Sequence, residues 1–173
     1  MSSWFHDTLR EGDELLVSAP AGEFVYTPEP NVKTMFISAG IGLTPFISAL
    51  GDIEKRPHGG IHFVHGAHAP DTQAFADYVQ GLATKGVIKA DVFYSTGLPS
   101  DTAATAGQTL HAGRVTTEWL ATQIQPDMHY RVCGPDQFML DMITGLKALG
   151  VATTHIHYEF FGSASDAQLL AAA

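Results

Sequence analysis

The amino-acid sequence predicts an α/β domain with an open parallel sheet of about five strands and helices on both faces. From residue 32 onward, short apolar runs alternate with stretches of helical periodicity, as in a parallel sheet with crossover helices. Two of these runs lead directly into a glycine turn with a proline behind it, a pattern typical of strand-to-helix junctions. The 173 residues, 45% of them hydrophobic, suffice for one core.

The expected elements follow one another in chain order. The strands are Thr34–Ser38, Ile61–His65, Lys89–Tyr94, Tyr130–Cys133 and His155–Tyr158. The helices are Pro45–Ile53, Thr72–Leu82, Thr116–Ala121 and Pro135–Leu149. The last helix is the best defined, because Phe138, Met142, Ile143 and Leu146 share one face and Gly150 ends it. The small, polar residues 95–113 indicate a surface loop.

Residues 1–30 form a separate segment before the α/β domain at residues 31–173. The run Glu14–Ser18 predicts a strand and Pro20–Phe24 a turn, together too short to build a core.

Composition excludes several classes of function. Nine basic against 18 acidic residues give a net charge of -9, which argues against nucleic-acid and membrane-surface partners. No apolar run approaches the roughly 20 residues that span a bilayer. Cys133 is the one cysteine, so an internal disulfide and a thiolate-held iron–sulfur cluster are excluded, and a cytoplasmic location fits.

The most informative motif is the glycine turn between Phe36 and Pro45. Gly40 and Gly42 lack a Cβ, so the backbone amides of this turn can approach a diphosphate closely. Thr44 is expected to cap the following helix and Pro45 to occupy its first position, with the positive end of the helix dipole facing the phosphates. The competing interpretation is a strand-to-helix junction that is capped for stability alone, which would have the same sequence. The position of the turn, after the first strand of the alternating region, favours a binding site.

A second junction, Val132-Cys133-Gly134-Pro135, repeats the pattern. A buried structural cysteine is the competing interpretation, but two such turns on neighbouring strands would border one crevice. The second strand ends in His65-Gly66-Ala67-His68, without an acidic residue for a ribose hydroxyl and without Arg or Lys for a 2′-phosphate. This favours NADH over NADPH, with NADPH left possible.

The last strand leads into the aromatic pair Phe160 and Phe161, which either closes the core or stacks on a flat ring. His155 and His157 alternate and share a face. Without a third ligand beside them, no metal site is expected.

Together these segments resemble the reductase end of flavohemoglobins, within the ferredoxin–NADP reductase-like superfamily. The resemblance rests on four motifs in the family's order, spread over almost the whole chain: Ser2–His6, Ala19–Phe24, Ile37–Pro45, and Tyr130–Phe138 with Ile156–Gly162. It implies a ferredoxin-reductase-type nucleotide-binding domain, with residues 1–30 as the remnant of a flavin-binding β-barrel. It also implies hydride transfer from NADH to FAD, and in intact family members onward electron transfer to a globin haem that converts nitric oxide to nitrate.

The resemblance carries roles to matching positions. It implies that the NADH diphosphate is held by Gly40, Ile41, Gly42, Leu43, Thr44 and Pro45. It places Cys133 beside the nicotinamide, with Gly134 and Pro135. It places Glu159, Phe160, Phe161, Gly162 and Ser163 at the flavin–nicotinamide boundary, with Phe161 over the isoalloxazine. Ser2, Ser3 and His6 match the end of the FAD site. A Gly42→Val substitution is then expected to abolish NADH binding without unfolding the protein.

The flavin-gripping Arg-x-Tyr-Ser/Thr element of the superfamily is absent, since no arginine is followed by tyrosine two positions on. We therefore expect a fragment or a split gene that binds FAD poorly on its own and shares it with a barrel domain in cis or in trans. The alternatives are the reductase component of an oxygenase, a free-flavin reductase, and a non-catalytic nucleotide-binding module.

Overall fold

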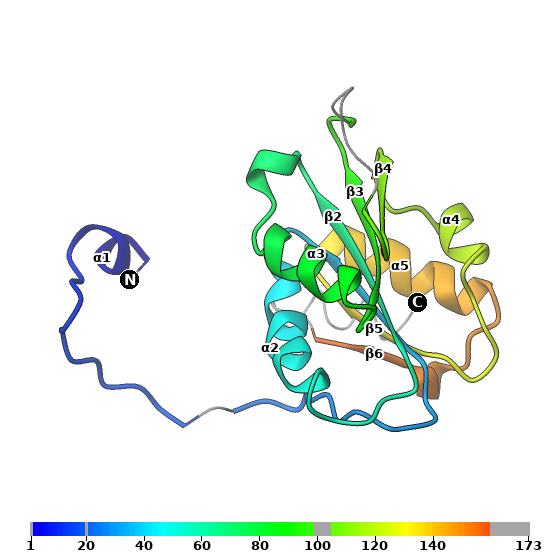
Figure 1. Ribbon diagram of the computed structural model, residues 1–173, viewed down its shortest axis with the longest axis horizontal. Helices are drawn as coiled ribbons and strands as arrows, with labels where there is room; N and C mark the ends of the chain where they lie inside the picture. Colours follow the sequence, from blue (N-terminus) through cyan, green and yellow to red (C-terminus); the bar gives the residue numbers. More distant parts are fainter. Residues whose placement is uncertain (1, 20, 99–104, 160–173) are drawn as a thin grey trace.

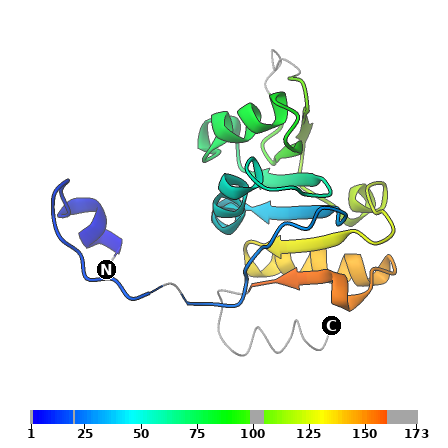
Figure 2. The same ribbon diagram turned by 60° about the horizontal axis from the view of Figure 1, so that its bottom comes forward.

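A computed structural model describes residues 2–19, 21–98 and 105–159. Within them, six parallel strands form one sheet in the order β4-β3-β2-β1-β5-β6 (Figures 1 and 2). The strands are β1 Thr34–Ala39, β2 Ile61–Ala67, β3 Lys89–Tyr94, β4 Gln108–Ala112, β5 His129–Cys133 and β6 Ile156–Tyr158. The predicted fold class is confirmed, with one more strand than expected.

The helices cover both faces of the sheet, as Figure 1 shows. These are α2 Thr44–Ile53, α3 Ala76–Thr84, α4 Thr117–Ala121 and α5 Asp136–Ala148, while a further helix, α1 Ser2–Asp7, lies in the N-terminal segment. Short 3-10 turns lie at η1 Gly40–Leu43, η2 Pro70–Thr72 and η3 Thr153–His155. The helices α2 and α3 pack on one face, around Phe36 and Phe63, and α4 and α5 pack on the other, around Ile37 and Val132. The central strands are buried on both faces, which explains why they appear in the sequence as continuous apolar runs.

Three expectations about elements were wrong. Residues 108–112 of the expected loop form the edge strand β4, which the pattern hides because an edge strand needs little apolar alternation. The third helix begins at Ala76 instead of Thr72, because Phe75 adopts a left-handed φ of 57° at its N-cap. Residues 14–18 form no strand.

The remaining differences are small. α5 buries Met139 as well as the expected Met142, Ile143 and Leu146, whereas Phe138 is only half-buried. β1 and β2 each run one or two residues beyond their expected ends, and β6 begins one residue later than expected.

The N-terminal segment projects from the α/β domain. Figures 1 and 2 show α1 standing apart from the sheet on an extended stretch of chain. The segment reaches the domain at Phe24 and Tyr26, whose rings pack against Phe46 and Phe36 at centroid distances of 5.9 and 5.0 Å. The guanidinium of Arg131 lies over both N-terminal rings, 5.7 Å from Phe24 and 5.1 Å from Tyr26.

Candidate functional site

The two glycine turns lie against each other at the carboxyl edge of the sheet. Strands β1 and β5 are neighbours, and their last paired residues are Ser38 and Cys133. A Cβ on Gly42 would lie 2.4 Å from the carbonyl oxygen of Cys133 and 2.5 Å from the Cα of Gly134. Only glycine permits this approach, because both contacts are to backbone atoms. The prediction that the turns share one edge is confirmed.

The amides at the start of α2 have no side-chain cap. The N-cap residue is Leu43, which makes no side-chain hydrogen bond, and the Thr44 hydroxyl donates to the carbonyl of Ile41 at 3.1 Å. The expectation that Thr44 caps the helix was therefore wrong, and Pro45 occupies the second helical position rather than the first. Gly40 is exposed with a φ of 53°, and a Cβ there would meet nothing within 4 Å. The turn thus offers an open backbone surface to a ligand.

The second helix start has the same character. Pro135 is the N-cap of α5, and it too makes no side-chain hydrogen bond. A Cβ on Gly134 would lie 3.3 Å from the backbone nitrogen of Ala39 and 2.8 Å from the ring of Phe138. Two uncapped helix N-termini therefore converge on one edge, and their dipoles favour an anionic group there.

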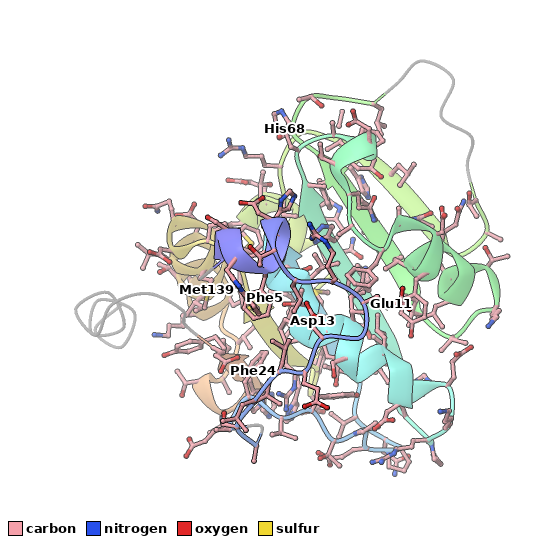
Figure 3. The ribbon with its side chains drawn as sticks, turned by 90° about the vertical axis from the view of Figure 1, so that its left-hand side faces the viewer. Phe5, Glu11, Asp13, Phe24, His68 and Met139 are labelled. Carbon is pink, nitrogen blue, oxygen red and sulfur yellow. The ribbon has the colours of Figure 1, made fainter. Side chains whose placement is uncertain are left out.

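A pocket of about 350 Å³ extends from these turns along the carboxyl edge. It is lined by the ends of β1 to β4 and the first turns of α5: Ala39, Gly66, Ala67, His68, Ser95, Gly113, Arg114, Val115, Pro135, Gln137, Phe138, Asp141 and Met142. His68 lies at the top of Figure 3, away from Phe24 at the bottom of the view. Such a volume is typical of small-molecule sites.

Sequence reasoning missed Arg114 as a residue of this pocket. It follows β4 by two positions, and β4 itself was expected to be a loop. The signal that could have found it is the position of a basic residue just after a short run of β-branched and apolar residues near Leu110.

Cys133 and Glu159 are brought together at the same edge. The Cys133 side chain is fully buried, and its burial together with the negative charge of Glu159 raises the pKa of the thiol to about 11. Glu159 also approaches the N-terminal segment, with its carboxylate 3.6 Å from a Cβ built on Gly22. The thiol therefore stays protonated near neutral pH and can contribute shape and contact, but not a thiolate.

Ser38 and His65 form a buried pair beneath the first glycine turn. The Ser38 hydroxyl lies 2.9 Å from Nδ1 of His65 and 3.2 Å from the carbonyl of Val64. Desolvation lowers the pKa of His65 to about 4, so its imidazole is neutral at physiological pH. The pair joins the ends of β1 and β2 and so supports the turn from below.

Some predicted site residues lie elsewhere. Ser2, Ser3 and His6 belong to α1, which stands apart from the glycine turns in Figures 1 and 2. Phe160, Phe161, Gly162 and Ser163 lie outside the described residues.

A third histidine joins the two that the sequence places on one face. The Nε2 of His157 lies 3.2 Å from Nδ1 of His129, whose ring stacks on that of His155 at 4.5 Å. Even so, no group of His, Cys, Asp or Glu in the described part of the chain has a geometry that could hold a metal ion. Among the described helices, none has the length and apolar character that a membrane crossing requires.

Comparisons with known proteins agree with this geometry. Residues 36–143 match the family described as "Oxidoreductase NAD-binding domain". The flavohemoprotein of Bacillus cereus is 37% identical over 171 residues, which are 97% of this chain and 42% of the relative. That of Bacillus subtilis is 35% identical over 94% of this chain and 41% of its own length. This chain thus spans about two fifths of the curated relatives it matches.

A solved structure has the same fold. The flavohem-like FAD/NAD-binding domain of nitric oxide dioxygenase from Vibrio cholerae is similar with a TM-score of 0.75 and 28% identity. The match covers 94% of this chain and 64% of that structure.

Proposed function

This chain belongs to the oxidoreductase NAD-binding domain family, and from that membership we propose that it binds NADH and presents it to FAD for hydride transfer. It is homologous to the reductase region of flavohemoproteins. We extend the proposal to a cytoplasmic enzyme in which a flavin barrel and a globin haem, in cis or in trans, pass the electrons on to nitric oxide dioxygenation.

The observation that supports the proposal most is the interlocked pair of glycine turns with two uncapped helix starts. The amides at the start of the η1 turn, before the amide of Thr44 that already donates to the carbonyl of Ile41, are proposed to bind the diphosphate, because an acidic chain of net charge -9 must hold a phosphate by local dipoles. Pro45 at the second position of α2 and Pro135 at the N-cap of α5 have no amide hydrogen of their own. The residues present therefore fit a dinucleotide.

The flat end of the dinucleotide is proposed to lie toward β5 and β6. When bound, NADH supplies a hydride and FAD accepts it. Cys133, Gly134 and Glu159 would border that reaction space, where a neutral thiol excludes water without adding charge. Phe161 is proposed to stack on the flavin, and Phe160, Gly162 and Ser163 to lie at the boundary between flavin and nicotinamide. The contribution of the protein is positioning, which can lower a barrier by about 7–11 kcal/mol.

The first experiment measures NADH binding by the full chain with Gly40→Val. Gly40 is open and exposed, so a valine would project into the proposed diphosphate space and weaken NADH binding at least about tenfold. Gly86→Val is the matched control. Gly86 also has a positive φ of 72°, and a Cβ built on it would meet nothing within 4 Å. It follows the C-terminal end of α3, at the edge of the sheet opposite the glycine turns. Backbone strain should be similar in both variants. Equal NADH affinity in the two would refute the diphosphate assignment.

A second experiment separates a half-enzyme from a nucleotide-binding module. A flavin barrel from a flavohemoprotein reductase is added to the chain with FAD, and NADH-dependent dye reduction is measured. Reduction that requires both proteins supports the reductase function. NADH binding without any reduction, in the presence of a flavin-loaded barrel, would leave only a binding module.

A further inference from the structure

Arg131 places a positive charge inside the sheet. All nine Lys and Arg residues of the chain lie within the described ranges, and Arg131 alone occupies the middle of a strand, as the third of the five residues of β5. Because side chains alternate along a strand, it points to the same face as Cys133, which packs in the apolar cluster beneath α2. A guanidinium stays charged at physiological pH, so a half-buried one needs a compensating partner.

The partners that the structure supplies are two aromatic rings. The Arg131 guanidinium lies 5.7 Å from the ring centroid of Phe24 and 5.1 Å from that of Tyr26. The Nε of Arg131 and the hydroxyl of Tyr26 are both buried, and neither has a hydrogen-bond partner in the described part of the chain. Burial raises the pKa of Tyr26, so this hydroxyl keeps its proton and can donate. Two donors therefore lack an acceptor, which is unfavourable in a buried place.

Arg131 and Tyr26 also line a pocket of about 300 Å³. Three parts of the chain form it: residues 24–26 of the N-terminal segment, α2 and β5. Figure 3 labels Phe24, where the segment meets the domain. The pocket shares no lining residue with the 350 Å³ pocket at the carboxyl edge. Its volume suits a small ligand, and most of its remaining wall is apolar, with Phe24, Val25, Pro45, Phe46 and Ala49.

The carboxylates near this pocket leave the charge of Arg131 uncompensated. Within residues 2–19, 21–98 and 105–159, no carboxylate oxygen lies within 4.0 Å of its guanidinium. Asp52 lines the pocket, but its carboxylate pairs with Arg56 at 3.4 Å on the surface of α2. Glu29 attracts the guanidinium only from beyond ion-pair distance, and Glu29 is exposed. A charged fork beside an apolar pocket is thus left for an anion from solution.

We propose that this pocket binds a small monocarboxylate with a flat apolar body, such as an aromatic carboxylate. The two carboxylate oxygens pair with the guanidinium fork of Arg131, and one accepts from the Tyr26 hydroxyl. The flat body packs on the apolar wall at Phe46 and Ala49. A single uncompensated charge selects a monoanion, and the apolar wall disfavours a strongly hydrated ion such as inorganic phosphate. This inference goes beyond the proposed function and does not depend on it.

The test measures the binding of benzoate to the full chain by calorimetry at low ionic strength. Three comparison ligands separate the contributions: benzamide has the ring without the charge, acetate has the charge without the ring, and phosphate has neither ring nor carboxylate. Benzoate should bind at least about tenfold more tightly than each of them, because it alone satisfies both the guanidinium and the apolar wall.

Arg131→Met removes the charge and keeps a long side chain. It should bring the affinity for benzoate to within about twofold of that for benzamide. Because the variant loses an uncompensated charge, urea unfolding should show it to be no less stable than the wild-type chain. Lys147→Met is the matched control. It removes a positive charge from α5, on the opposite face of the sheet, and should leave the affinity for benzoate unchanged.

Two milder variants carry the test if Arg131→Met does not fold. Tyr26→Phe keeps the ring and should weaken benzoate binding about fivefold. Arg131→Lys keeps the charge but loses the fork, and should weaken it at least about threefold. Three results would overturn the inference: no measurable benzoate binding to the wild-type chain, binding of benzamide or phosphate as tight as that of benzoate, or unchanged benzoate affinity in the folded Arg131 variants.

Discussion

Gly42 and Gly51, nine residues apart, have very different surroundings. A Cβ on Gly42 would overlap the backbone of Cys133 at 2.4 Å, whereas a Cβ on Gly51, inside α2, would meet nothing within 4 Å. We predict that Gly42→Ala lowers the free energy of unfolding by about 1–3 kcal/mol, as overpacking does. Gly51→Ala should raise it by about 0.5–1 kcal/mol through helix propensity. Urea unfolding of both variants measures the difference.

If Gly42→Ala were as stable as the wild-type chain, the close approach of the two turns would be in error. The close approach of Gly42 to the backbone of Cys133 also changes what is expected of the Gly42→Val variant that the sequence suggested. That variant would disturb folding and NADH binding together, so the expectation of a loss of binding without unfolding does not hold for a buried glycine wedged against backbone.

Cys133 gives a prediction about thiol reactivity. Its pKa is raised to about 11 by burial and by Glu159, and its side chain is fully buried. At pH 8 we expect the folded chain to react with a disulfide reagent such as DTNB at least about 100-fold more slowly than the urea-unfolded chain, because the thiolate is scarce and shielded. A stopped-flow comparison of the two states measures this ratio. Rapid labelling of the folded chain would contradict the buried, protonated thiol.

A buried carboxylate joins three strands of the sheet. Asp91 on β3 accepts from His62 on β2 and from His111 on β4, each at 2.6 Å, and lies 3.3 Å from Lys89. Burial acts to raise its pKa, but the hydrogen bonds from His62 and His111 and the nearby positive charges outweigh it. The pKa therefore falls from 3.8 to about 2. This carboxylate stabilises the edge of the sheet where the missed strand β4 is added.

The pH dependence of stability follows from that pKa. Because the folded pKa is below the unfolded one, the stabilisation is present above about pH 4 and is lost as pH falls toward 2. It amounts to on the order of 2 kcal/mol. Asp91→Asn should lower the free energy of unfolding at pH 7 by about 2–4 kcal/mol and flatten its decline between pH 4 and 2. Chemical denaturation as a function of pH tests both effects.

Asp52→Asn is the control for this prediction. Asp52 is 60% exposed and pairs with Arg56 at 3.4 Å on the surface of α2, so its removal should change stability by less than about 0.5 kcal/mol. Equal effects of the two substitutions would show that Asp91 contributes no more than an exposed carboxylate.

The elements that the sequence predicts best are those that packing fixes. The central strands and α5 are buried, so their apolar periodicity survives in the sequence, and only their ends differ by a residue or two. β4 was not predicted, because its side chains are half-exposed and it pairs with β3, which lies well before it in the sequence. The start of α3 was not predicted, because the left-handed residue at its N-cap is Phe75 and not the glycine or asparagine that usually adopts this conformation.

The N-terminal segment is weakly attached to the α/β domain. Its exposed side chains include Leu16 and Val17, the latter 78% exposed, and packing on the domain begins at Phe24 and Tyr26. We predict that deletion of residues 1–19 changes the free energy of unfolding by less than about 0.5 kcal/mol and reduces self-association of the chain. Sedimentation and urea unfolding measure the two effects.

Deletion of residues 1–27 is the contrasting variant. It removes the rings of Phe24 and Tyr26 and the face that Arg131 covers, and should lower stability by about 2–3 kcal/mol. A large loss of stability from the shorter deletion would mean that α1 packs on the domain in solution.

The candidate site could be predicted in outline but not in full. Both glycine turns are visible as motifs, and parallel strands with a shared edge bring them together as expected. Arg114 was missed because residues 108–112 were expected to be a loop, and its place in the pocket depends on the order of strands β2 to β4 as well as on local sequence. The role of Thr44 was wrong because a threonine beside a glycine turn can bond either forward or backward along the chain, and here it bonds backward to Ile41.

The wedge of Gly42 between Cys133 and Gly134 has a consequence for anyone exchanging parts between homologous reductases. Neither loop can be transplanted alone, because the backbone of residues 133–134 lies so close to Gly42 that a Cβ there would come within 2.4–2.5 Å of it. In a chimaera that takes residues 39–45 from a homologue but keeps its own residues 132–135, the two loops would no longer fit each other. Taking both segments from the same homologue would preserve their close packing. The two loops therefore have to be exchanged together, although Gly42 and Cys133 lie more than 90 positions apart in the sequence.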